Sequence, residues 1–148
     1  MRLSRETRRE VEEFFRAHTG EPWLVLPPIR VHAGAWGRLL TQVAGASAIT
    51  LGRSVFVGPS AVRKDSGGRL KIDGGLLVHE AAHVLQYEGR GWAGFLAGYL
   101  RGYFLELWRW KSLGAEARKA AYLSIPEERA ARAAEGAYFE WRRRAGGA

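Results

Sequence analysis

The segment from Val78 to Val84 reads Val-His-Glu-Ala-Ala-His-Val and places two histidines four positions apart, with a glutamate directly after the first. On an α-helix, side chains at i and i+4 lie on one face, so His79 and His83 can reach the same metal ion. Glu80, turned about 100° away, can address a water molecule bound to that ion. This spacing is typical of zinc hydrolases and predicts two metal ligands and a general base.

The flanking residues support a helix from about Gly75 to Glu88. Asp73 can cap the first backbone donors of such a helix, and Gly89 can end it in a left-handed conformation. Apolar side chains surround most of its circumference, which is typical of a helix buried in the centre of a domain. The alternative is that both histidines are structural and hydrogen-bond to backbone carbonyls.

A chain of 148 residues fits one domain spanning residues 1–148, and it is long enough to bury a sizeable core. The chain has no cysteine, so any zinc must be held by histidine and carboxylate. Residues Met1 to Glu6 carry charges where a signal peptide would have its apolar part, so we expect a cytoplasmic protein.

The net charge of +8 raises the question of a nucleic-acid partner. The basic residues are scattered, with clusters only at Arg5 to Arg9 and Arg142 to Arg144, and no aromatic-flanked basic stripe is present. We therefore expect solvated arginine-rich surfaces and no specific nucleic-acid partner.

Hydrophobic periodicity and turn residues predict an α+β fold, with a small sheet before the motif helix and a mostly helical second half. The expected elements before the motif are a first helix from Ser4 to His18 ending at Gly20, a strand over Ile29–His32, a short helix over Trp36–Val43, a hairpin of Ala48–Leu51 and Ser54–Val57, and a surface loop over Val62–Lys71.

An aromatic segment follows the motif, from Gly91 to Trp110. Arg101 and Glu106 interrupt its apolar residues, so it is too short to be a membrane-spanning helix. We expect this segment to pack in the core, and the alternative is a face that binds a membrane surface or a hydrophobic partner.

A catalytic zinc typically has three protein ligands, so His79 and His83 need a partner. A third histidine ten positions after the first is absent, because that position is Gly89. The other histidines, at positions 18 and 32, lie upstream, and we interpret His32 as a strand residue. A carboxylate on a later helix is then the simplest third ligand.

Such a helix is predicted to begin near Pro126, with Ser124 as its cap, and to continue to about Arg143. Either Glu127 or Glu128 would project from its first turn.

Four stretches of this chain resemble the small zincin-like domains sometimes called minimal gluzincins. They are Ile29–His32, Gly45–Gly52, Ser54–Val57 and Leu76–Gln86. Domains of this kind have a small sheet, an active-site helix and a later helix that brings a glutamate to zinc. The resemblance implies the same arrangement here and covers about Ile29 to Glu135.

The later helix of these domains commonly opens with an Asn-Pro-x-Glu pattern. Ile125-Pro126-Glu127-Glu128 is similar to it, with isoleucine in place of asparagine, so the resemblance implies that Glu128 is the third ligand. Glu127 stays a rival. Ala130 stands where these domains often have an acidic residue two places after the ligand.

The leading hypothesis is a zinc metallopeptidase in which His79, His83 and Glu128 hold zinc and Glu80 is the general base. Ser54–Val57 is a candidate edge strand for binding an extended peptide substrate. Tyr122 is interpreted as a buried structural tyrosine, with an oxyanion donor as the alternative. The alternative function is a non-catalytic or latent zinc-binding module that acts at a membrane surface or on a protein partner.

Overall fold

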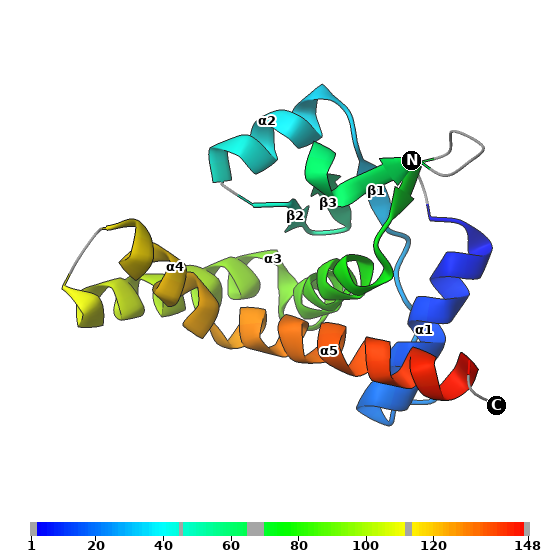
Figure 1. Ribbon diagram of the computed structural model, residues 1–148. Coiled ribbons are helices and arrows are strands. Elements are labelled where there is room, and N and C mark those ends of the chain that lie inside the picture. Colours follow the sequence, from blue (N-terminus) through cyan, green and yellow to red (C-terminus); the bar gives the residue numbers. More distant parts are fainter. Residues whose placement is uncertain (1–2, 45, 65–69, 112–113, 147–148) are drawn as a thin grey trace.

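A computed structural model describes residues 3–44, 46–64, 70–111 and 114–146, and its fold is α+β (Figure 1). The elements in chain order are α1 (Arg5–Thr19), β1 (Arg30–His32), α2 (Ala35–Ala44), β2 (Ala48–Leu51), β3 (Ser54–Val57), the 3-10 helix η1 (Pro59–Ala61), β4 (Val62–Lys64), β5 (Leu70–Ile72), α3 (Gly74–Trp110), α4 (Ala115–Ser124) and α5 (Pro126–Gly146). The expected first helix, first strand, short helix and hairpin are confirmed.

The main sheet has the strand order β1-β3-β2. The predicted hairpin forms, because β2 and β3 pair antiparallel with Leu51 opposite Ser54. The prediction that Ser54–Val57 is an edge strand is wrong, because β1 pairs parallel with the other side of β3. This long-range pairing has no local signal in the sequence. It makes β3 the central strand and leaves β2 at an edge.

The segment expected to be a surface loop, Val62–Lys71, is instead partly strand. Its two ends, β4 and β5, form an antiparallel pair in which Val62 lies opposite Ile72. Residues 65–69 lie outside the described part of the chain. The prediction of a loop failed because each strand has only three residues, which is too short for an alternating pattern to be distinctive.

The motif helix α3 begins as expected and runs further than expected. The Asp73 carboxylate accepts hydrogen bonds from the backbone N–H groups of Gly75 (2.9 Å) and Leu76 (3.3 Å), so Asp73 is its cap. The helical course breaks at Gly91, where φ is 71° and ψ is 166°, and then resumes to Trp110. The predicted stop at Gly89 is therefore two residues early. Backbone angles like those of Gly91 are almost confined to glycine.

Helix α3 lies in the centre of the molecule, with the sheet and α2 on one side and α5 along the other (Figure 1). Its buried face joins apolar side chains of α1, of the sheet and of α5 in one core. From α1 these are the predicted Val11, Phe14 and Phe15. The packing fixes both ends of the motif helix relative to α5, so residues on the facing sides of α3 and α5 are held together.

The junction between α4 and α5 differs from the prediction. Ser124 is the last residue of α4, where its hydroxyl donates to the carbonyl of Ala121 at 2.8 Å, so it is not the cap of α5. The fully buried Ile125 separates the two helices, and Pro126 begins α5 as expected. The backbone carbonyl of Ile125 accepts a hydrogen bond from the N–H of Arg129 at 3.0 Å, and this residue before α5 is apolar, so it does not offer a side-chain cap.

Candidate metal centre

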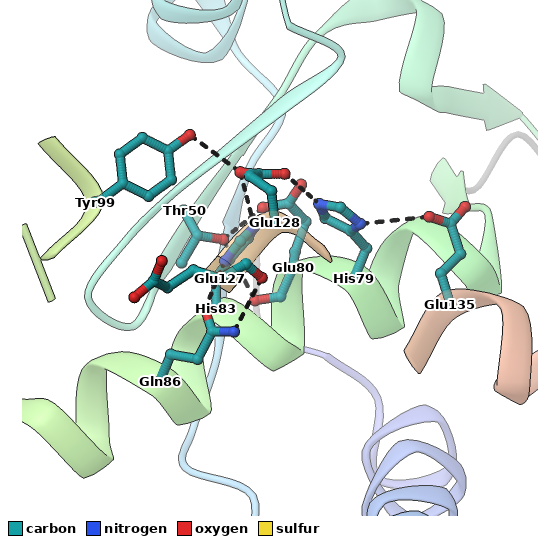
Figure 2. A network of polar contacts seen from close by, with 9 residues as sticks. All are labelled: Thr50, His79, Glu80, His83, Gln86, Tyr99, Glu127, Glu128 and Glu135. Atoms are coloured by element: carbon teal, nitrogen blue, oxygen red, sulfur yellow. Dashed lines mark hydrogen bonds and ion pairs between the residues drawn. The ribbon is translucent and has the colours of Figure 1, made fainter. Parts of the chain in front are cut away.

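Two helices bring His79, His83 and Glu128 together, the first two from α3 and the third from the first turn of α5 (Figure 2). The Nε2 atom of His79 lies 3.4 Å from Oε2 of Glu128, and Nε2 of His83 lies 3.3 Å from Oε1 of the same carboxylate. All three residues are at most 7% exposed. We call these residues the His-His-Glu cluster. Their candidate ligand atoms lie within 4.8 Å of one another, so the cluster could hold a metal ion.

The neighbouring Glu127 is equally buried but turns away from the cluster. Its carboxylate forms an ion pair with Arg90, and its backbone carbonyl accepts a hydrogen bond from the Gln86 amide at 3.1 Å. Consecutive residues of a helix point about 100° apart, so only one of the two glutamates can face the histidines. The structure places Glu128 there.

The outer ring nitrogens of both histidines also have partners. Nδ1 of His83 lies 2.9 Å from the Gln86 side-chain oxygen, and Nδ1 of His79 lies 3.3 Å from Oε2 of Glu135 (Figure 2). An acceptor at Nδ1 favours the tautomer that carries its proton there and leaves the lone pair on Nε2. Both Nε2 atoms face Glu128, as a shared metal site requires.

Glu135 is a site residue that sequence reasoning missed. The family pattern predicts an acidic residue at position 130, which is alanine in this chain. The carboxylate that reaches His79 comes from later in α5. Glu128 and Glu135 are seven residues apart, which is two helical turns, so they share one face of α5. This seven-residue spacing could have identified Glu135 as a candidate site residue from the sequence.

The electrostatics of Glu128 fit a cation. Burial would raise the pKa of this carboxyl, but the contacts with His79, His83 and Tyr122 outweigh it and hold the pKa well below its usual range. Glu128 is therefore an anion in a buried place. Its Oε2 accepts no hydrogen bond from the described residues, an arrangement that is costly in a protein interior.

The negative charge of Glu128 also affects the pKa of His83. Burial opposes protonation of His83, but its contacts with Glu128 and Gln86 and the charge of Glu80 together outweigh burial and raise the pKa of His83. Without a metal, a proton on His83 partly compensates the Glu128 charge. A zinc ion would compensate it instead, and the donor set of two imidazole nitrogens and a carboxylate oxygen is one that zinc prefers.

Glu80 lies beside the cluster and has a different environment. The hydroxyl of Thr50, on strand β2, donates to Oε2 of Glu80 at 2.6 Å. Burial raises the pKa of Glu80, and the Thr50 hydrogen bond opposes that rise. Thr50 was not singled out from the sequence, because only the folded sheet brings β2 over the motif helix. Its contact holds the Glu80 carboxylate in one orientation.

Two tyrosines complete the surroundings of Glu128. The Tyr99 hydroxyl, from the second part of α3, donates to Oε1 of Glu128 at 3.1 Å. Tyr122, from α4, contacts the same carboxylate, and burial together with the charge of Glu128 raises the pKa of both phenols. Both hydroxyls therefore stay protonated. For Tyr122 the oxyanion role stays an alternative to the predicted structural role.

The two remaining histidines lie outside the cluster. His32 is in β1, as expected, and its ring stacks on Phe56 with the ring centroids 4.8 Å apart. His18 is exposed near the end of α1, where its ring stacks on the buried Phe14.

Comparison with known families supports a zincin-like reading of this geometry. The sequence profile of the eCIS core domain matches residues 2–91 of the chain. This domain is zincin-like and is associated with extracellular contractile injection systems. The match includes His79, Glu80 and His83 and ends before Glu128. No curated protein and no solved structure matches the chain.

Proposed function

This chain belongs to the eCIS core domain family, and from the geometry of the His-His-Glu cluster we propose that it is a zinc-dependent peptidase. The observation that carries the proposal is the convergence of His79, His83 and Glu128 within 4.8 Å, with Glu80 held beside them by Thr50. A purely structural pair of histidines would not need a buried anion opposite both Nε2 atoms.

In the proposed reaction His79, His83 and Glu128 hold the zinc ion. When bound there, zinc polarises a peptide carbonyl and lowers the pKa of a water molecule toward about 7. Glu80 accepts a proton from the attacking water and delivers it to the nitrogen of the leaving amine as the C–N bond breaks. A carboxylate whose pKa is raised by burial is suited to this exchange, because it binds and releases a proton more evenly near neutral pH.

The substrate would bind along β2 rather than β3. An extended peptide can pair with an edge strand through main-chain hydrogen bonds. Strand β2 is at an edge of the sheet, and its Thr50 contacts Glu80, so a peptide on this edge would run close to the general base. Leu51, the next residue of β2, is exposed and offers apolar contact to a substrate side chain.

A chelation experiment tests the proposed function. The purified protein is incubated with a broad peptide library, and cleavage is followed by mass spectrometry before and after metal removal. We expect cleavage to stop when zinc is chelated and to return when about one equivalent of zinc is added. Cleavage that is unaffected by chelation would contradict a zinc mechanism. Bound zinc without cleavage of any library member would instead favour a latent, zinc-binding module.

A second prediction concerns the carboxylate behind His79. Glu135→Gln should weaken zinc binding by about 10–100-fold, because this partner orients the imidazole and raises its basicity. Affinity can be measured by competition with a chromogenic chelator. Glu140→Gln is the matched control, since Glu140 lies on the same helix and pairs only with Arg144 among the described residues. Equal affinities of the two variants would exclude a positioning role for Glu135.

A further inference from the structure

The second part of α3, after the break at Gly91, leaves an apolar stripe uncovered. Leu100, Phe104 and Trp108 follow one another at intervals of four residues, so they lie on one face of the helix. Phe104 is 61% exposed and Trp108 is 78% exposed. The expectation that the aromatic segment packs in the core therefore holds for only part of it, namely Phe95 and Leu107, which are buried.

The opposite side of the same helix explains why this stripe is left outside. Gly102 lies against Ile125 and Pro126, and Tyr99 reaches Glu128, so one face of the helix is committed to α5 and the cluster. A helix of this length cannot bury both faces against one neighbour. Contiguous exposed aromatic residues on a protein surface mark an interaction site more often than isolated ones do.

The charged residues around the stripe favour contact with an anionic surface. Between Trp92 and Ser124 the sequence has five cationic residues against two acidic ones, an excess of three positive charges. Arg101 is exposed beside the stripe, and Arg109 and Lys111 follow it. Of the acids, Glu106 forms an ion pair with Arg109. Tryptophan, phenylalanine and leucine flanked by arginine and lysine are typical of helices that lie in the headgroup region of anionic lipids.

The position of the stripe in the fold also favours a flat surface. In Figure 1 the end of α3 and α4 extend together on the side of the molecule opposite α1 and the C-terminus. Phe104 and Trp108 lie toward the end of this helical pair. No helix in the described ranges is long and apolar enough to cross a membrane, so contact with lipid would be made from one side.

We propose that the face formed by Leu100, Phe104, Trp108 and Arg101 docks on an anionic lipid surface. The aromatic rings enter the headgroup region, and the arginine and lysine side chains contact lipid phosphates. This contact is independent of peptide hydrolysis.

Vesicle binding by the full chain tests this proposal. We expect the protein to co-sediment with vesicles of phosphatidylcholine and phosphatidylglycerol, to bind vesicles of phosphatidylcholine alone much more weakly, and to dissociate as salt is raised. The double variant Phe104→Gln with Trp108→Gln should lose at least about tenfold in partitioning, because two large apolar side chains no longer enter the lipid. Arg101→Gln should weaken binding by roughly fivefold.

The matched control is Trp23→Gln with Trp36→Gln, which removes two tryptophans that are 76% and 71% exposed elsewhere on the surface. Its partitioning should stay within about twofold of the unmodified protein, and circular dichroism and zinc content should be unchanged in every variant.

Absence of binding to anionic vesicles would overturn the proposal, and so would equal losses in the two double variants. Salt-insensitive binding to both kinds of vesicle would exclude an anionic surface. Self-association that depends on Phe104 and Trp108, without vesicle binding, would assign the face to a second copy of the chain instead.

Discussion

The Glu80→Gln variant is expected to bind zinc as the unmodified protein does and to lose at least ~10²-fold in peptide hydrolysis. Glutamine keeps the shape of the side chain and can still accept the hydrogen bond from Thr50, so the packing of α3 against β2 is preserved. What it removes is the ability to take a proton from water and return it to the leaving amine. The measurement is kcat/KM on a cleaved peptide, together with bound zinc per chain.

Glu88→Gln is the matched control for this variant. Glu88 lies on the same helix, but it is exposed and pairs with Arg53 outside the His-His-Glu cluster. It should leave hydrolysis within about twofold, as surface substitutions usually do. Hydrolysis that survives in Glu80→Gln would exclude Glu80 as the base, even with zinc correctly bound.

Replacement of Glu128 is expected to abolish stoichiometric zinc binding, and replacement of its neighbour is not. Glu128→Gln removes the buried anion opposite both Nε2 atoms, so zinc affinity should fall by more than the ~10–100-fold that loss of a supporting residue causes. Glu127→Gln changes an equally buried carboxylate that pairs with Arg90 outside the cluster. Both variants replace a buried glutamate by glutamine. A difference in zinc binding between them therefore reports the position of the side chain, and not its burial or its chemistry.

His79→Ala and His83→Ala should resemble Glu128→Gln in zinc content. Metal per chain after dialysis, measured by atomic emission, is sufficient for the comparison. A greater loss in Glu127→Gln than in Glu128→Gln would move the third ligand to Glu127. Undiminished zinc in both histidine variants would show that any bound zinc lies elsewhere.

Features with a local signal could be predicted from the sequence. The capping side chains of Ser4 and Asp73, the turn at Gly52 and the proline at the start of α5 act within a few residues of their position. The spacing of His79 and His83 on one helical face is also a local feature, because the two residues are four positions apart. Glu128 lies beside both histidines, where family resemblance and the proline directed the prediction, and its role as a metal ligand stays a prediction.

Features that depend on tertiary contacts could not be predicted. The pairing of β1 with β3 makes β3 a central strand, and no residue near Ser54 predicts this pairing. Thr50 and Gln86 became site residues because the fold brings β2 over α3 and the first turn of α5 beside Gln86. The break of α3 fell at Gly91 instead of Gly89, because two glycines two residues apart are equal candidates in the sequence.

Anomalous diffraction at the zinc absorption edge, from crystals of the full chain purified without added metal, would locate any bound zinc ion. We expect one zinc ion at the His-His-Glu cluster, with Nε2 of His79 and His83 at about 2.0–2.1 Å and a Glu128 carboxylate oxygen at about 2.0–2.2 Å. Zinc bound through Glu127, zinc bound at any other position, or no zinc at the cluster in a chain that carries one equivalent in solution would contradict this expectation.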